Sequence, residues 1–255
     1  MIRLTPEDGP AVVTGAGSGL GRALSVELAQ QGFTVIGTGR RAEALAETAA
    51  QAGPRFHPLP LDVSDAKAVR SAFAKVKTEH GAVALLINNA AVYPRRDMLD
   101  ETAESFLETV AINLGGVVAC SRAALEQMCE TGRGRILNVA TFADLNPLPA
   151  SSAYSVSKGA ARIFTRALIA DTADRFPGIV IGDWMPGMLQ TTMGIPDGLP
   201  PEASAKWGVE LALRCDPALT GAVFEQDTEV LPPRGLKGKL KDLLLLRRRR
   251  PRRLV

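Results

Sequence analysis

The residues with the clearest chemical potential in this sequence are a tyrosine and a lysine four positions apart, in Tyr154-Ser155-Val156-Ser157-Lys158. In a helix this spacing puts both side chains on one face, one turn apart. A free tyrosine has a pKa of about 10, so acid–base work near neutrality needs a downward shift of about 2–3 units, which a nearby cation can supply. The pair therefore predicts a proton donor, with Lys158 lowering the pKa of Tyr154.

A glycine-rich turn forms the second motif. A short apolar run leads into Thr14-Gly15-Ala16-Gly17-Ser18-Gly19-Leu20-Gly21, and an amphipathic helix follows. Glycine lets the backbone approach a pyrophosphate closely, and the first turn of a helix offers free N–H groups and a positive dipole end. This strand, turn and helix predict a dinucleotide site. Because position 20 is Leu, the spacing is Thr-Gly-x-x-x-Gly-x-Gly rather than the more general G-x-G-x-x-G.

With further motifs in the same order, the chain resembles the short-chain dehydrogenase/reductase family over about residues 9 to 225. Asp62-Val63 match the family's adenine contact, and Asn88-Asn89-Ala90-Ala91 match its Asn-Asn-Ala-Gly except at Ala91. The segment from Pro186 to Thr191 looks like the loop that grips the nicotinamide carboxamide, through the Leu189 backbone and the Thr191 hydroxyl. The cofactor-binding residues implied by this resemblance are Gly15, Gly17, Ser18, Gly19, Leu20, Gly21, Asp62, Val63, Asn89, Ala90, Tyr154, Lys158, Pro186, Gly187, Leu189 and Thr191.

The resemblance also implies a catalytic group of Asn113, Thr141, Tyr154 and Lys158. Asn113 matches the family's Asn that holds a proton-relay water, and Lys158 matches its ribose-binding Lys. Thr141 stands where the family normally has a Ser that hydrogen-bonds the substrate carbonyl. Thr keeps the hydroxyl, but its methyl restricts the rotamer. We expect the chemistry to survive and the substrate fit to change; the alternative is a non-catalytic relative in which Thr141 merely ends a strand.

The choice of cofactor depends on the end of the second expected strand. NAD-specific sites place an acid there for the ribose 2′-OH, whereas this chain has Gly39 followed by Arg40 and Arg41. Arg40 can pair with a 2′-phosphate through charge-assisted hydrogen bonds. Arg41 is expected to begin the next helix in solvent. The sequence thus favours NADP, with NADPH preferred over NADH.

The apolar pattern alternates strands with helices along the chain. Such alternation predicts an α/β fold: a Rossmann-type doubly wound parallel sheet of seven strands, in a single domain over 1–230, with the site beyond the carboxyl ends of the strands. The expected strands lie near 10–14, 33–38, 55–61, 82–88, 134–140, 178–184 and 221–225, and the expected helices near 20–31, 41–52, 65–79, 102–130, 152–176 and 202–214.

Composition supports one large core and no disulfide framework. The chain has 255 residues, 46% of them hydrophobic, and three cysteines without metal or redox spacing. His57 and His80 stand apart from every matched motif, so no metal site is expected. Residues 1–10 lack the pattern of a secretory signal and no apolar run reaches spanning length, so we expect a cytoplasmic protein.

The segment between Met193 and Glu202 is too short, and too rich in Pro and Gly, to form the helical lid that many relatives carry. We therefore expect a more open substrate site, or one covered by another part of the chain. Substrate identity is left undetermined: steroids, sugars, acyl thioesters and small ketones all remain open.

A basic tail, residues 231–255, follows the last expected strand. It holds ten bases and one acid, so it carries +9 while the whole chain carries +3, which leaves −6 for the rest. A short amphipathic helix on an anionic membrane, contact with nucleic acid, docking on an acidic partner and a solvated end are all compatible with this composition. No specific nucleic acid is predicted. We expect deletion of residues 237–255 to leave the stability of the core nearly unchanged.

Together these features predict an NADP(H)-dependent oxidoreductase that interconverts a carbonyl and an alcohol by hydride transfer, with Tyr154 as proton donor and acceptor. The expected partners are a small carbonyl or alcohol substrate and further copies of the chain in a homodimer or homotetramer. The alternative is a non-catalytic NADP-binding sensor or scaffold tethered through its basic tail. The intact Asn113, Tyr154 and Lys158 argue for the enzyme, whereas Thr141, the short lid and the tail favour the alternative.

Overall fold

The computed structural model describes residues 2–232 and 250–254. Its strands form one sheet in the order β3-β2-β1-β4-β5-β6-β7-β8. Neighbours from β3 to β7 run parallel, and β8 runs antiparallel to β7. The strands are β1 (Ala11–Thr14), β2 (Val35–Gly39), β3 (Phe56–Pro60), β4 (Leu85–Asn88), β5 (Gly134–Val139), β6 (Ile179–Met185), β7 (Val223–Glu225) and β8 (Thr228–Glu229).

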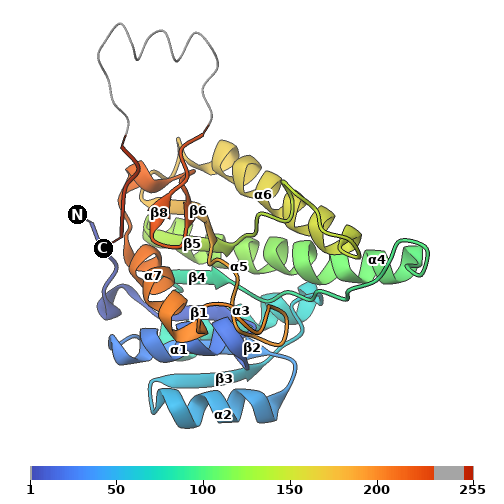
Figure 1. Ribbon diagram of the computed structural model, residues 1–255. Coiled ribbons are helices and arrows are strands. Elements are labelled where there is room, and N and C mark those ends of the chain that lie inside the picture. The colour runs from blue at the N-terminus through green and yellow to red at the C-terminus, as the bar shows by residue number, and fades with distance from the viewer. Residues whose placement is uncertain (1, 233–249, 255) are drawn as a thin grey trace, which may run out of the picture.

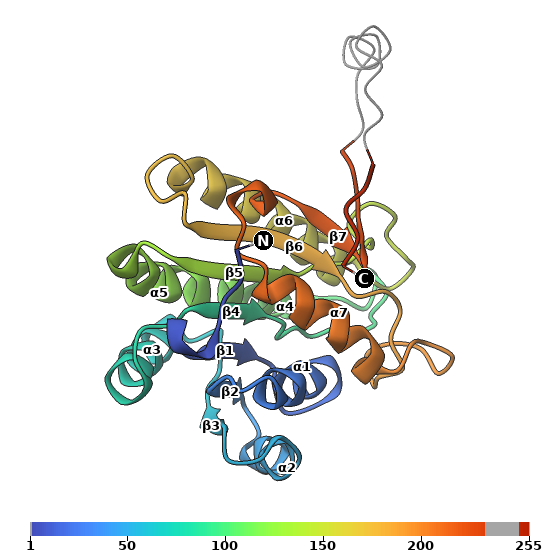
Figure 2. The ribbon, with the colours of Figure 1, turned by 90° about the vertical axis from the view of Figure 1, so that its left-hand side faces the viewer.

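Helices cover both faces of this sheet. Figure 2 shows the strands stacked from β3 to β7, with α1 and α7 on one side and α3 and α5 on the other. Figure 1 shows α4 and α6 side by side, and the two helices are in contact. The helices are α1 (Gly19–Gln30), α2 (Ala42–Ala52), α3 (Ala66–His80), α4 (Ala103–Val110), α5 (Gly116–Thr131), α6 (Ser152–Thr172) and α7 (Pro201–Leu213), with short 3-10 turns at η1 (Pro6–Asp8) and η3 (Pro217–Leu219) and a π-helical turn at η2 (Ala111–Gly115).

Burial on both faces explains why the central strands have continuous apolar sequences. Every residue of β1, β4 and β6 is buried, as expected for parallel strands that are sandwiched between helices. One apolar cluster packs α1 and α7 on the sheet around Leu24, Trp184 and Val209. The other packs α3 and α5 on the opposite face around Phe73 and Met128. The doubly wound parallel α/β sheet predicted from the sequence is confirmed.

The seven predicted strands are all present as the parallel strands β1 to β7, and the sheet of the described residues contains one further strand that was not predicted. The added strand, β8, forms a hairpin with β7 in which Glu225 pairs with Thr228. Gln226 in the turn has a φ of 51°, in the left-handed region. A strand of two residues is too short to produce an alternating pattern that sequence analysis could recognise.

The helix expected over 102–130 is interrupted in its middle. α4 and α5 are joined end to end by the π-helical turn η2, which contains Asn113. Such turns insert one extra residue per turn and often occur at functional sites. The combined helical run, Ala103–Thr131, is the one span among the described residues that is long and apolar enough to cross a membrane, by length and composition alone. Core helices of soluble proteins have the same length and composition.

The described end of the chain packs against the core. Leu254 is 5% exposed and belongs to the cluster beneath α1 and α7. Arg252 forms a two-pronged ion pair with Glu229 of β8, at 2.6 and 2.8 Å. Arg214 donates to the carbonyl oxygens of Arg253 and Leu254. The contacts of residues 250–254 oppose the expectation that deletion of residues 237–255 leaves the stability of the core nearly unchanged. The expectations for residues 233–249 lie outside the described residues.

Candidate active site

One large cavity opens at the carboxyl ends of the parallel strands. Its volume is about 1650 Å³, and loops that follow β1, β2, β3, β4, β5 and β6 line it. This is the edge at which doubly wound sheets bind ligands. Apart from Asn113, the structure brings every predicted cofactor-binding and catalytic residue to the wall of this cavity. They extend from the glycine-rich turn of residues 15–21, which we call the phosphate turn after its predicted role, to Thr141, Tyr154, Lys158 and Thr191.

The glycine-rich turn is tied to the loop after β4 by Thr14. The Thr14 hydroxyl accepts hydrogen bonds from the backbone N–H groups of Asn89 and Ala90, at 2.9 and 3.0 Å, and the Asn89 amide donates back to the Thr14 carbonyl. Gly19 has a φ of 50°, which suits glycine. A Cβ at Gly21 would lie 2.1 Å from the Gly15 carbonyl oxygen, so no larger residue fits there. These contacts leave no room for side chains at Gly15 and Gly21, so the chain passes close to the loop after β4.

At the far end of the cavity, Arg40 and Arg41 are both exposed and both line it. Arg41 is also the N-cap residue of α2. A Cβ at Gly39 would meet Leu45 at 3.6 Å, an ordinary contact, so packing does not force a glycine at this position. Asp62 accepts hydrogen bonds from the backbone and hydroxyl of Ser64, which hold its pKa below the usual value. The charge of Arg40 also helps to lower the pKa of Asp62, so this carboxylate lies near Arg40 at the same end of the cavity.

The predicted catalytic pair, Tyr154 and Lys158, lies on α6 in a buried setting. Lys158 is 5% exposed and donates from Nζ to the Val139 carbonyl, at 2.7 Å. Burial lowers the pKa of Lys158 to about 8, against the opposing effect of Asp183. Burial also raises the pKa of Tyr154, although a hydrogen bond with Thr141 acts the other way. The direction is opposite to the one expected, because desolvation of the phenol outweighs the groups that favour its ionised form.

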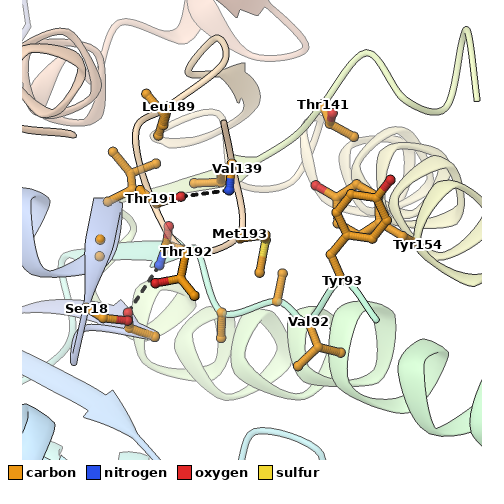
Figure 3. Close-up of a pocket in the computed structure, with 18 of the residues that line it drawn as sticks. Ser18, Val92, Tyr93, Val139, Thr141, Tyr154, Leu189, Thr191, Thr192 and Met193 are labelled. Carbon is orange, nitrogen blue, oxygen red and sulfur yellow. Dashed lines mark hydrogen bonds between the residues drawn. The ribbon is translucent and has the colours of Figure 1, made fainter. Parts of the chain in front are cut away.

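Tyr93, in the loop after β4, covers the phenol of Tyr154. Its ring stacks on that of Tyr154, with centroids 4.4 Å apart and planes 19° from parallel. Figure 3 shows the two rings superposed, with Thr141 beside them and Val92 below. The Thr141 hydroxyl accepts from the Ala143 N–H at 3.2 Å, which fixes the loop after β5. A hydroxyl, a phenol and a second aromatic ring thus meet at one place in the cavity.

Asn113 links the loop after β4 to α6. Its side chain is fully buried, accepts from the Val92 N–H at 2.7 Å, and donates to the Val92 carbonyl and the Ser157 hydroxyl. The residue does not line the cavity, so its amide positions the backbone next to Tyr93 rather than facing a ligand. Its expected part in holding a relay water stays a prediction.

A buried polar network lies behind Lys158. Asn88 donates to Asn138, Asn138 donates to Thr165, and Thr165 donates to the Asp183 carboxylate at 2.7 Å. Asp183 is 4% exposed, and burial raises its pKa to about 6, while Thr165, Arg162, Arg166 and Lys158 act in the opposite direction. A carboxylate so placed favours the cationic form of Lys158.

The loop after β6 covers the phosphate turn. It closes on itself through backbone bonds between Gln190 and Leu199 and between Leu199 and Met188. A Cβ at Gly19 would lie 3.1 Å from the Thr191 methyl, which shows how closely the loop approaches the turn. Arg95 donates to the Met193 and Gly194 carbonyl oxygens and stacks over the Tyr93 ring, 5.4 Å from its centroid. A compact loop, latched by Arg95, thus occupies the segment that is too short for a helical lid.

Sequence reasoning missed Tyr93, Arg95 and Asp183. A signal existed for Asp183, because it is the one charge within the apolar run Ile179–Met185. Tyr93 and Arg95 come from an irregular loop without a recognisable pattern. His57 and His80, which the sequence suggested were isolated, pack ring against ring at 4.5 Å. Within the described part of the chain, no group of three or more His, Cys, Asp or Glu residues could hold a metal ion.

Comparisons with known proteins agree with this geometry. A family model described as short chain dehydrogenase matches residues 10–198. "Probable oxidoreductase EphD" of Mycobacterium tuberculosis is 36% identical over 185 residues, which are 71% of this chain but 31% of that protein. The chain thus matches less than a third of the length of that relative.

Two further relatives match larger shares of their own length. "Probable NADP-dependent dehydrogenase" of Haemophilus influenzae is 34% identical over 164 residues, covering 64% of this chain and 65% of that one. "2-(R)-hydroxypropyl-CoM dehydrogenase" of Xanthobacter autotrophicus is 35% identical over 190 residues, covering 72% of this chain and 75% of that one. The interpretation as a non-catalytic sensor is not favoured by these matches. The chain belongs to the short-chain dehydrogenase family, whose members use NAD(P) cofactors.

Proposed function

We propose that this protein interconverts a carbonyl and an alcohol with NADP(H) as its cofactor and Tyr154 as its proton donor and acceptor. The observation that carries the proposal is the convergence of the phosphate turn, Arg40, Thr141, Tyr154 and Lys158 on one cavity. Two-electron reduction of a carbonyl needs a hydride and a proton delivered to the same group. NADPH, when bound, supplies the hydride; the protein supplies the proton and the orientation.

The residues at the nucleotide end fit a phosphorylated dinucleotide. The positive φ of Gly19 and the close packing at Gly21 leave the backbone of the turn and the N-terminus of α1 facing the cavity, where N–H groups and the helix dipole favour a pyrophosphate. Arg40 is exposed at the end of β2, beside a Gly39 that packing does not require, and suits a 2′-phosphate. The name of the Haemophilus relative supports the preference for NADPH.

At the catalytic end, Thr141 and Tyr154 act on the substrate oxygen. Both hydroxyls line the same cavity, and Thr141 acts on the pKa of Tyr154, so a carbonyl oxygen placed between them can accept from both. A phenol whose pKa is raised stays protonated at neutral pH, as a proton donor must. Lys158, cationic below about pH 8, stabilises the phenolate that remains after the transfer. In alcohol oxidation the same groups act in reverse.

The remaining proposals concern the oligomeric state, the substrate and the cellular location of the protein. Exposed apolar side chains on α4, α5 and α6, among them Leu107, Val118, Val156 and Ile163, support a homodimer or homotetramer built on this face. A small carbonyl or alcohol compound is the proposed substrate, and the cytoplasm the proposed location. A contact of the basic tail with an anionic membrane or an acidic partner stays a hypothesis about residues 233–249, outside the described part of the chain.

Substitution of Tyr154 by Phe tests the chemistry directly. The variant keeps the ring that stacks on Tyr93 and removes the proton, so kcat should fall by about 10²–10⁴-fold while NADPH binding stays within about twofold. Turnover is followed as nicotinamide absorbance on a panel of ketones and aldehydes, and cofactor binding by fluorescence titration. If the Tyr154→Phe variant turned over substrate as fast as the parent protein, Tyr154 would have no part in the mechanism.

A further inference from the structure

The substrate end of the cavity has an apolar entrance. Phe142 and Leu148 line it from the loop between β5 and α6, and Met188 and Met193 line it from the loop between β6 and α7. We call these four residues the apolar mouth. Each exposes between 37% and 56% of its surface, although each borders a cavity. Large exposed apolar side chains at the rim of a cavity are typical of ligand-binding surfaces.

The mouth is continuous with the reacting groups. Phe142 directly follows Thr141, and both line the cavity together with Tyr154. Across from them, the Met193 carbonyl accepts from Arg95, whose guanidinium stacks over the ring of Tyr93. Figure 3 shows the Met193 side chain between Thr192 and the stacked rings of Tyr93 and Tyr154. A molecule whose oxygen meets Thr141 and Tyr154 would therefore extend along hydrocarbon.

Charge is concentrated at the other end. Asp62 is the sole acid among the described residues that line the cavity, and it lies near Arg40 at the nucleotide end. Two cations line the region around Tyr154, and both are engaged: Lys158 with the Val139 carbonyl and Arg95 with two loop carbonyls and a ring. A hydroxyl-rich substrate would place polar groups against Phe142, Leu148 and the two methionines without hydrogen-bond partners, which is costly.

We propose that the substrate is a neutral, apolar ketone or secondary alcohol whose hydrocarbon body lies in the apolar mouth. The inference rests on the proposed function for the position of the reacting carbon. It selects among the substrate classes that the sequence left open: it favours compounds with a long chain or fused rings, and it excludes sugars. Burial of the four mouth residues against hydrocarbon removes apolar surface from water, so each added methylene should strengthen the interaction.

A chain-length series tests the proposal. With NADPH and the full-length protein, kcat/KM for unbranched 2-alkanones of four to ten carbons should rise by about threefold per methylene until the mouth is filled. Hydroxylated ketones of matched length should react at least about 10-fold less efficiently. A kcat/KM that is independent of length, or higher for the hydroxylated series, would overturn the proposal.

Paired methionine variants give the control. Met188→Ser should reduce the ratio of long-chain to short-chain kcat/KM by about 10-fold. Met98→Ser removes the same side chain from a site of similar exposure, 61% against 56%, that does not line the cavity, and should leave the ratio unchanged. Equal effects of the two substitutions would contradict a specific role for the mouth.

A binding readout separates this inference from the proposed function. Titration calorimetry of the same ketones into Tyr154→Phe protein saturated with NADP measures affinity without chemistry. The apolar mouth is supported if affinity rises with chain length and falls by about 10-fold in the Tyr154→Phe/Met188→Ser double variant. This holds even if the parent protein turns over no ketone. Lack of turnover would refute the proposed reaction and not the apolar mouth. Affinity that does not depend on length overturns the inference, whatever the activity.

Discussion

The two ends of the cavity are built in different ways. At the nucleotide end, the turn from Gly15 to Gly21 presents backbone, and its form follows from glycines that allow a positive φ or a close approach. At the other end, Tyr154 and Lys158 are surrounded by groups from other elements: the ring of Tyr93, the Val139 carbonyl and the charge of Asp183. A site formed by backbone atoms is specified by residues close together in the sequence. A site formed by side chains from several elements depends on residues that meet only after folding.

Gly21→Ala should break the nucleotide end and leave the catalytic end intact. The new Cβ would lie 2.1 Å from the Gly15 carbonyl oxygen and 2.6 Å from the Asn89 amide, so the turn must shift. We expect the NADPH dissociation constant to rise by about 100-fold, as measured by fluorescence titration. Gly115→Ala is the control, because nothing lies within 4 Å of its added Cβ. Unaltered binding in the Gly21 variant would show that the phosphate turn tolerates displacement.

Leu254→Ala tests a region remote from both ends. The side chain is buried in the cluster beneath α1 and α7, so its truncation should lower the free energy of unfolding by about 2–3 kcal/mol. The NADPH affinity and kcat of the folded enzyme should not change. Urea unfolding at one pH measures the difference, with Val230→Ala as an exposed apolar control. If Leu254→Ala did not lower the free energy of unfolding by more than Val230→Ala does, the end of the chain would not contribute to the core.

Arg40→Ala sharpens the account of the nucleotide end. Removal of the guanidinium should weaken NADPH binding by about 1.5–3 kcal/mol and leave NADH binding nearly unchanged, because NADH has no 2′-phosphate. Arg41→Ala is the matched control, since Arg41 is the next residue, lines the same wall and occupies the N-cap position of α2 without a side-chain capping bond. Both cofactors are titrated against all three proteins. Equal losses for NADH and NADPH would refute the assignment.

Asp183→Asn probes the catalytic end through pH. The native pKa of Asp183, about 6, lies above the ordinary value of 3.8, so its protonated form favours the fold; that stability is present below about pH 4 and is lost as pH rises through 6. The asparagine of the variant has no carboxyl group to titrate, so its stability does not change with pH for this reason. Between pH 4 and pH 7 the variant should therefore gain about 2 kcal/mol of stability relative to the parent, measured by urea unfolding.

The same variant should alter activity in a second way. Without the Asp183 charge, the pKa of Lys158 should fall further below about 8, and the alkaline limit of kcat should move to lower pH. Asp144→Asn, which changes a half-buried carboxylate paired with Arg162, is the control for general loss of charge. An unmoved pH profile would show that Asp183 has no influence on Lys158.

Local patterns in the sequence determine much of this protein. The alternation of apolar strands and amphipathic helices predicts the doubly wound sheet, because each face of a parallel strand must be buried. The glycine-rich turn and the four-residue step from Tyr154 to Lys158 could also be recognised in the sequence, because each motif consists of residues close together in the chain. Both motifs line the cavity. Periodicity cannot reveal β8, which has two residues, nor the π-helical turn inside a pattern typical of one helix.

The tertiary structure alone decided the electrostatics of the site and the contacts between distant segments of the chain. The direction of the Tyr154 pKa depends on burial, which no spacing of residues encodes. The stack of Tyr93 on Tyr154, the latch from Arg95 to the loop after β6 and the return of Leu254 to the core join residues far apart in the chain. The sequence by itself therefore determined the fold class and the kinds of reacting groups. Packing decided their ionisation and what surrounds them, because desolvation and long-range contact exist only in the folded chain.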